Sequence, residues 1–199
     1  MNKDIFINLA KLFNKNGYRL YMIGGTSRDY LLGIDFSDYD FCTDATPSDM
    51  KKFLPNASYT FEKYGSVQLK IDGIHVDITT LRIEDSYVDN RHPLNIKFTK
   101  KLEEDYKRRD FTINAIYIDE NFQSIDYCGG LIDLNNKIIR FIGNPDIRIK
   151  EDPLRILRAE RFQRKLNFIF EENTKKAIEN NHNLISKLNP QKVEQELKK

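Results

Sequence analysis

Apolar positions at the start of the chain recur with the spacing of an amphipathic helix. Ile5, Leu9 and Phe13 share one helical face, and Gly17 follows them as a stop signal. The next apolar run, residues 19–23, predicts a strand. The chain therefore opens with a helix that leads into the first strand of a sheet.

Short helices and strands alternate after this first strand. Gly24 and Gly25 predict a tight turn, followed by a short helix over residues 28–32 and a second strand that holds residues 38–42. The Thr-Pro pair at residues 46–47 predicts another helix start, because threonine caps a helix and proline needs no N–H at its first position.

A hairpin and a long loop come next. Residues 66–71 and 74–80 alternate apolar and polar side chains on either side of Asp72-Gly73, which predicts a β-hairpin. In the second of these strands, Asp77 faces away from the apolar side. From Arg82 to Thr99 no period holds, so this stretch is predicted to be a long loop, of a kind that is often functional.

The rest of the chain changes from mixed structure to helix. A charged helical turn leads into an apolar strand over residues 113–118, and residues 138–141 predict a last short strand. From Pro153 onward helical spacing prevails, with further helices over residues 177–185 and from Pro190. We therefore predict an α+β fold, with a mixed sheet and flanking helices, followed by an all-helical segment.

Composition and charge narrow the class of protein. The 199 residues are 40% hydrophobic and 31% charged, which excludes a disordered or fibrous chain. The net charge is +2, so a nucleic acid would have to meet a local basic patch. No apolar run is long enough to cross a membrane, no signal sequence opens the chain, and Cys42 and Cys128 lack partners at metal-ligand spacing. We therefore expect a cytoplasmic protein with reduced thiols and no membrane association.

Two carboxylates are the clearest candidates for chemistry. Asp38 and Asp40 are two positions apart in a predicted strand, so their side chains leave the same face. Two acids about 4 Å apart repel by on the order of 4 kcal/mol at an effective dielectric constant of about 20, and a divalent cation removes this cost. Two solvated acids on an exposed strand are the alternative. If the strands are neighbours, Asp77 joins the pair, and three hard oxygen donors suit Mg²⁺.

The glycine turn before this strand is a candidate anion site. N–H groups at the start of a helix are free to bind an anion, and Gly24 and Gly25 precede a helix with Arg28 beside them. A glycine pair alone is more often an ordinary turn. No dinucleotide-binding or P-loop glycine motif occurs, so neither of those folds is indicated.

Two further segments concentrate charged residues. Residues 107–115 read Lys-Arg-Arg-Asp-Phe-Thr-Ile-Asn-Ala, and residues 151–161 place Asp152 and three arginines at intervals of three. This spacing predicts a single helical ridge. Such a ridge is either a solvated helix face laced by ion pairs or a surface that meets the edge of a base, for which the planar fork of arginine is suited.

Together these motifs resemble the bacterial class II tRNA nucleotidyltransferases, the CCA-adding enzymes, and their poly(A) polymerase relatives. The resemblance rests on Gly-Gly-x-x-Arg-Asp, on Asp-x-Asp ten residues after that arginine, on Arg-Arg-Asp-Phe-Thr-Ile-Asn-Ala and on Glu-Asp-x-x-Arg. It extends over residues 21–162, including residues 126–133 and the loop at 87–93. It implies a polymerase-β-type nucleotidyltransferase head over residues 1–145 and the start of a helical neck over residues 146–199.

The resemblance also implies a role for each candidate residue. Asp38 and Asp40 would bind Mg²⁺, and Asp77 stands where a third catalytic carboxylate is expected. Asp152 and Arg155 would read the base edge of CTP or ATP. The residues implied to contact or support the ribose and phosphates are Gly24, Gly25, Arg28, Arg109, Asp110, Asn114, Arg158 and Arg161.

The implied activity is template-independent transfer of CMP and AMP from CTP and ATP to the tRNA 3′ end, with release of pyrophosphate. A relative that adds only A, only CC or poly(A) is an alternative, as is a non-catalytic nucleotide- or RNA-binding head. The loop over residues 83–97 favours full CCA addition. Two positions depart from the family: Ser27 replaces a small aliphatic residue, and residues 189–193 replace a Ser-x-Glu-Arg-Ile type sequence. We expect most of the family's neck, body and tail to be missing from this chain.

Overall fold

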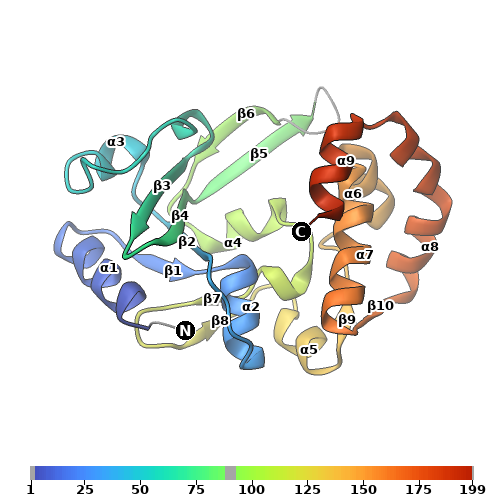
Figure 1. Ribbon diagram of the computed structural model, residues 1–199, viewed down its shortest axis with the longest axis horizontal. Helices are drawn as coiled ribbons and strands as arrows, with labels where there is room; N and C mark the ends of the chain where they lie inside the picture. Colours follow the sequence, from blue (N-terminus) through green and yellow to red (C-terminus); the bar gives the residue numbers. More distant parts are fainter. Residues whose placement is uncertain (1–2, 88–92, 199) are drawn as a thin grey trace.

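A six-stranded mixed sheet forms the centre of the structure, a computed structural model that describes residues 3–87 and 93–198 (Figure 1). The strand order is β3-β4-β2-β1-β7-β8, and every pair is antiparallel except β2 and β4. The strands are β1 (Leu20–Met22), β2 (Tyr39–Thr43), β3 (Ser66–Ile71), β4 (Ile74–Thr80), β7 (Tyr117–Ile118) and β8 (Ser124–Ile125). The predicted α+β class is confirmed.

Local turn chemistry accounts for two of the predicted elements. Asp72 and Gly73 both have positive φ angles, 49° and 84°, as a two-residue type I′ turn between β3 and β4 requires. The side chain of Thr46 accepts a hydrogen bond from the Asp49 N–H and caps α3 (Pro47–Met50). Both predictions from the sequence are confirmed.

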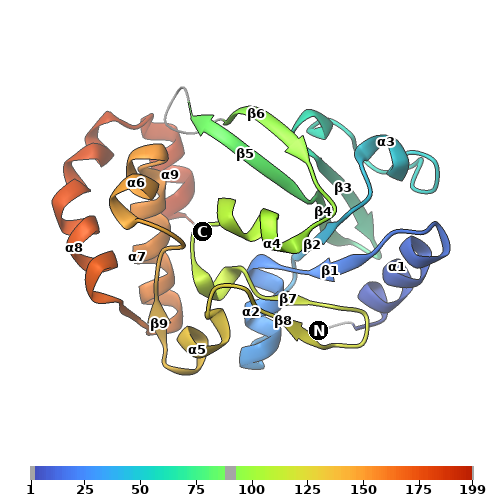
Figure 2. The same cartoon turned by 180° about the vertical axis from the view of Figure 1, so that it is seen from behind.

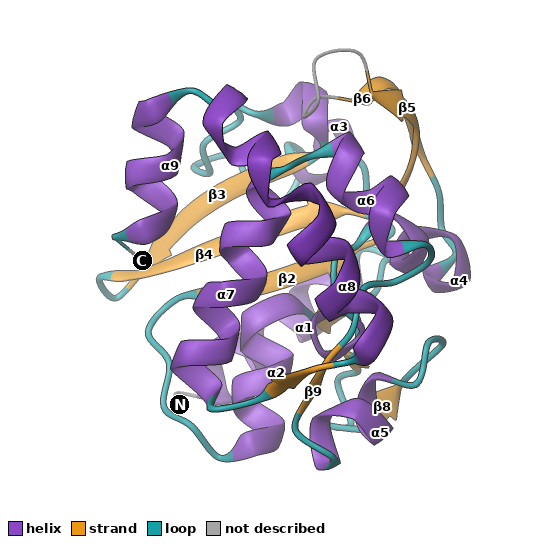
Figure 3. Cartoon of the chain, turned by 90° about the vertical axis from the view of Figure 1, so that its right-hand side faces the viewer, coloured by secondary structure: helices purple, strands orange, loops and turns teal. Residues whose placement is uncertain are grey.

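The two faces of the sheet have different neighbours. The N-terminal helix α1 (Lys3–Lys15) and α3 cover one face, and a core that includes Phe6, Phe13, Phe41 and Ile78 lies beneath them, each at most 1% exposed. The opposite face is turned toward the C-terminal helices (Figure 3). Because side chains alternate along a strand, β2 and β4 direct apolar groups to the first face and polar groups to the second.

The C-terminal helices lie together beside the sheet (Figure 2), and this half of the chain has a second core. Phe111, Ile113 and Ile156 are fully buried in it, and Leu31 of α2 (Gly24–Leu32) packs against both cores. The elements around it are α5 (Gly130–Asn135), α6 (Pro145–Glu151), α7 (Leu154–Leu166), α8 (Glu172–Asn181), α9 (Pro190–Leu197), β9 (Ile138–Ile139) and β10 (Ile169–Phe170). In the described part of the chain, no helix is long and apolar enough to cross a membrane.

The prediction of a long loop from Arg82 to Thr99 is wrong. This segment contains a second antiparallel hairpin, in which β5 (Arg82–Tyr87) pairs with β6 (Pro93–Phe98) apart from the main sheet. Residues 88–92 of the predicted loop lie outside the described residues. Apolar side chains do occupy every second position of β6, but Asp85 interrupts that alternation in β5, and this obscured the strand signal.

Other boundaries also differ from the prediction. Of the apolar run at 113–118, only the last two residues pair as a strand, because the run begins in a 3₁₀ turn and a fully buried run has no period that separates the two. The C-terminal part is not wholly helical, since β10 pairs in parallel with β9. The helix predicted at residues 177–185 is α8 followed by a 3₁₀ turn, and α2 begins earlier than predicted, at Gly24. The remaining short elements are α4 (Leu102–Asp105), η1 (Glu62–Tyr64), η2 (Tyr106–Arg108), η3 (Thr112–Asn114) and η4 (His182–Lys187).

Candidate active site

The three candidate acids lie together on the polar face of the sheet. Asp40 of β2 and Asp77 of β4 are partners in the parallel register, and Asp38 precedes β2 by one residue. Neighbouring strands are about 4.8 Å apart, so these side chains leave the same face at close range. Gln68 of β3 donates its side-chain amide to Oδ1 of Asp77 at 2.7 Å. The fold therefore makes neighbours of two strands whose relation the sequence left open.

The electrostatic cost of this arrangement falls on Asp40. Burial, followed by the negative charge of Asp77 and that of Asp38, raises the pKa of Asp40 from 3.8 to about 6. The positive charge of Arg109 and a hydrogen bond from the Gly25 N–H act in the opposite direction. Because the ionised form of Asp40 is disfavoured by its neighbours, a cation bound beside it would be favourable.

The first turn of α2 closes on the same carboxylate. Gly24 has a φ of 68°, and a Cβ atom there would lie 3.4 Å from Oδ2 of Asp40. A Cβ atom at Gly25 would lie 3.7 Å from the same oxygen. Both distances are ordinary contacts, so it is the positive φ of Gly24 that favours glycine, and the start of α2 lies against Asp40.

A cleft of about 630 Å³ opens in front of these groups. Asp40 lines it from β2 and Asp38 from the residue before that strand, Gly25 and Arg28 line it from α2, and Arg161 from α7. The cleft thus brings carboxylates together with guanidinium groups and a helix start. Groups of both signs suit a ligand that carries both a cation and an anion.

Arg28 is fixed inside the protein by several contacts. It pairs with Oδ1 of Asp29 at 2.6 Å, and its Nη1 donates to Oδ1 of Asn114 at 2.9 Å. Its guanidinium carbon also lies 4.9 Å from the centre of the Phe162 ring. Asn114 therefore contacts Arg28, which lines the cleft, and helps to orient its side chain.

A second group of predicted residues forms an ion-pair network at the start of α7. Asp110 pairs with Nε of Arg155 at 2.6 Å and also with Arg158. Arg155 pairs in addition with Glu151 at 2.7 Å, and Arg158 with Asp152 at 3.3 Å. Charges of opposite sign therefore alternate through this group, and Asp152 and Arg155 are buried within it.

Asp152 does not lie on the predicted helical ridge. It follows the last residue of α6 with an extended backbone, φ −151°, and α7 begins only at Leu154. Its Oδ1 accepts a hydrogen bond from the Leu154 N–H at 3.1 Å. The ridge therefore contains Arg155, Arg158 and Arg161, while the break between α6 and α7 turns Asp152 toward the first turn of the helix.

Arg109 is bound to a buried acid that the sequence reasoning missed. It pairs with Asp105 at 2.7 Å and lies 5.4 Å from the centre of the Tyr117 ring. Burial alone would lower the pKa of Arg109, but the charge of Asp105 raises it above its ordinary value. Asp105 also pairs with Arg108 at 2.7 Å, so its spacing of three and four residues from two arginines was an available signal.

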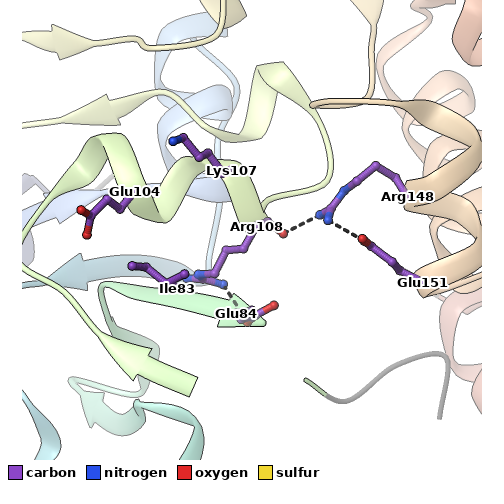
Figure 4. A pocket seen from close by; sticks show the side chains of 7 residues that line it. All are labelled: Ile83, Glu84, Glu104, Lys107, Arg108, Arg148 and Glu151. Carbon is purple, nitrogen blue, oxygen red and sulfur yellow. Dashed lines mark hydrogen bonds and ion pairs between the residues drawn. The ribbon is translucent and has the colours of Figure 1, made fainter. Parts of the chain in front are cut away.

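A smaller cleft, of about 450 Å³, lies between β5, η2 and α6 (Figure 4). Arg108 pairs there with Glu84 at 3.6 Å. Arg148 pairs with Glu151 at 2.5 Å and donates to the backbone carbonyl of Arg108 at 2.7 Å. These contacts connect η2 to α6, so they hold the C-terminal helices against the part of the chain that carries the sheet.

Comparison with known proteins connects this site to a family. Residues 20–140 match the family of the poly(A) polymerase head domain. The chain is 39% identical over 199 residues to a CCA-adding enzyme of Lactobacillus helveticus, a match that covers 98% of this chain and 50% of that protein. The chain thus spans about half the length of the curated relatives that it matches.

Solved structures give the same result in three dimensions. The crystal structure of the Bacillus stearothermophilus CCA-adding enzyme in complex with CTP superimposes with a TM-score of 0.87 at 34% identity, covering 96% of this chain and 46% of that one. A tRNA nucleotidyltransferase complexed with a primer tRNA and an incoming ATP analog has a TM-score of 0.77 at 34% identity, covering 96% of this chain and 55% of that one.

Proposed function

Because the chain belongs to the family of CCA-adding enzymes and carries its poly(A) polymerase head domain, we propose that it transfers CMP and AMP from CTP and ATP to the 3′ end of tRNA without a template. In this reaction the 3′-hydroxyl oxygen of the RNA bonds to the α-phosphorus of the nucleotide. The bond from that phosphorus to the β-phosphate oxygen breaks, and pyrophosphate leaves. The observation that carries the proposal is that two carboxylates, a glycine turn and two arginines line one cleft, while the third carboxylate, Asp77, is the register partner of Asp40 on the neighbouring strand.

Nucleotidyltransferases of this family generally depend on a divalent metal ion, and we propose Mg²⁺ for this chain. Among the residues that the structure describes, no group of three His, Cys, Asp or Glu side chains is placed so that it could hold a metal ion, so Asp38, Asp40 and Asp77 do not form the three-donor set expected from the sequence. Asp38 and Asp40 fit Mg²⁺ nevertheless, because this ion is often held by two carboxylates and completed by substrate phosphates. When bound, it would neutralise phosphate charge and favour ionisation of the attacking hydroxyl.

The other side of the cleft would hold the triphosphate. The first turn of α2, which begins at Gly24, is the positive end of that helix, and Arg28 and Arg161 add two fixed positive charges. Asp77 would serve as the third carboxylate beside Asp40. Together these groups would place the α-phosphorus next to the acids, with the negative charge of the leaving pyrophosphate next to the cations.

Selection of the base would fall to Asp152 and Arg155. Both are already engaged in the ion-pair network with Asp110, Glu151 and Arg158, so reading a base requires that some of these pairs open. Arg109 would act through its charge, because its guanidinium is held by Asp105. The network would thus hold Asp152 and Arg155 in orientation until a base of the right shape replaces some of their ion-pair partners.

We also propose that residues 1–145 form the catalytic head and residues 146–199 the start of the neck. Phe111 and Phe162, from the two sides of this boundary, pack edge to face with ring centres 5.6 Å apart, which supports a neck that is docked on the head. The free thiols of Cys42 and Cys128 support a cytoplasmic location.

Extension of tRNA that lacks its 3′ end tests the proposal. The chain is incubated with Mg²⁺ and with CTP, ATP or both, and the products are sized on a gel. We expect two added residues with CTP alone and three with both nucleotides. When both nucleotides are present, addition of A only, of CC only, or of a long A tract would assign the chain to a partial-specificity relative. No extension under any condition would contradict the proposed transfer.

A further inference from the structure

The two arginines that line the larger cleft share one aromatic ring. The guanidinium carbon of Arg28 lies 4.9 Å from the centre of the Phe162 ring, and that of Arg161 lies 4.8 Å from it. Cation–π contacts of this kind stabilise a guanidinium group on an aromatic ring. Phe162 therefore gathers two positive charges at the cleft that Asp38 and Asp40 also line.

Two guanidinium groups that contact the same ring repel each other, so each needs a compensating negative charge. Arg28 has its own acid, Asp29, at 2.6 Å. Arg161 has Glu196, a residue of α9, at 3.0 Å, and the side chain of Glu196 is only 9% exposed. Burial lowers the pKa of Arg161, the charge of Arg28 lowers it further, and the charge of Glu196 acts against both.

The geometry therefore points to Glu196 as a positioning residue: we propose that it holds Arg161 in the cleft, toward the phosphates of the bound nucleotide. Since α9 packs on α7, this contact makes α9 part of the nucleotide site (Figure 1). Without Glu196, repulsion from Arg28 would turn the Arg161 side chain outward, toward water. The inference rests on the proposed function, because it needs a nucleotide whose phosphates lie in this cleft.

A phosphate series separates positioning from mere support of the fold. Calorimetry with Mg²⁺ measures the affinity of CTP, CDP and CMP for the wild type and for Glu196→Ala, with the folded state checked by circular dichroism. We expect CTP affinity to fall about tenfold and CMP affinity by less than twofold, because a charge-assisted contact to phosphate is lost. Glu194→Ala is the matched control, since Glu194 lies on the same helix with a side chain that is 63% exposed; we expect no change.

Two further variants test whether Glu196 acts through Arg161. Glu196→Gln keeps an acceptor for the guanidinium, so we expect its CTP affinity to lie between those of the wild type and Glu196→Ala, even if the alanine variant folds poorly. In a double-mutant cycle, Glu196→Ala should change CTP affinity very little when Arg161 is already replaced by alanine.

Equal losses for CTP and CMP, tighter CTP binding, or additive effects in the cycle would overturn the inference while leaving the proposed function intact. A wild type that binds no nucleotide and extends no tRNA would overturn both.

Discussion

The two charged regions of this molecule solve opposite electrostatic problems. In and beside the cleft, Asp38, Asp40 and Asp77 bring charges of the same sign together, and burial together with these charges raises the pKa of Asp40 to about 6. At the start of α7, acids and arginines alternate, and Asp110 and Arg155 compensate each other at 2.6 Å. The first region becomes favourable only when it binds a cation, whereas the second is already satisfied and must open to bind a ligand.

This difference predicts different costs of mutation. In the proposed function, an acid in the cleft takes part in the chemistry and opposes stability, so its loss should stop transfer without unfolding the protein. An acid in the network stabilises the fold, so its loss should leave the arginines around it with less compensating charge.

The largest expected effect is on catalysis at the cleft. Asp40→Asn removes a proposed metal ligand, and we expect transfer to fall by at least about 10³-fold, because a bound cation supplies several kcal/mol of transition-state stabilisation. The melting temperature without metal at pH 7 should stay the same or rise, since a repelled carboxylate has been neutralised. Incorporation of labelled CMP and thermal unfolding measure the two quantities.

The control for this variant is Asp72→Asn, the same substitution at the exposed turn between β3 and β4. It should transfer CMP at the wild-type rate. A wild-type rate in Asp40→Asn as well would refute the metal-ligand assignment.

The next largest effect is on stability at the network. Asp110→Asn leaves Arg155 and Arg158 without their shared carboxylate, and we expect the free energy of unfolding to fall by about 3 kcal/mol, or roughly 6 to 12 °C in melting temperature. Glu172→Gln is the control, since the side chain of Glu172 is 70% exposed in its pair with Lys176. Similar losses in both variants would mean that the network is no more than a surface charge run.

A smaller effect is expected on the choice of nucleotide. Arg155→Lys keeps the charge in the network but loses the planar fork, and we expect kcat/KM for CTP and ATP to fall roughly ten- to hundredfold. Arg164→Lys, at an exposed position of the same helix, should leave it unchanged. If Arg155→Lys still uses CTP and ATP at full speed and excludes GTP and UTP, base recognition must lie elsewhere.

The smallest effect concerns pH. A carboxyl group with a raised pKa favours the fold in its protonated form, so Asp40 makes the metal-free protein less stable as pH rises from about 3.8 to about 6. Asp77→Asn removes a repelling charge, which should lower the pKa of Asp40 and reduce this loss by on the order of 1 kcal/mol. Thermal unfolding without metal at pH 4 and pH 7 measures the difference. An unchanged pH dependence would show that the two acids are not coupled.

Much of the local structure could be predicted from neighbouring residues alone. The Asp72-Gly73 turn, the Thr46 cap and the face of Asp77 on its strand follow from backbone chemistry within a few positions. The same reasoning was available at Asn144, which caps α6 just as Thr46 caps α3, yet that helix was not predicted. The hairpin of β5 and β6 was missed because Asp85 interrupts the alternation of apolar and polar side chains in β5.

The sequence by itself determined which residue types stand at which spacing, and so the α+β class, the acid pair, the glycine turn and the family resemblance. Only the tertiary structure decided which of these groups meet. In the folded chain, β2 and β4 are parallel neighbours. Asp110 pairs with arginines 45 and 48 residues further along the chain, and Arg161 pairs with Glu196 on another helix. These contacts join distant segments, and they depend on how the two apolar cores pack, which no local pattern of residues specifies.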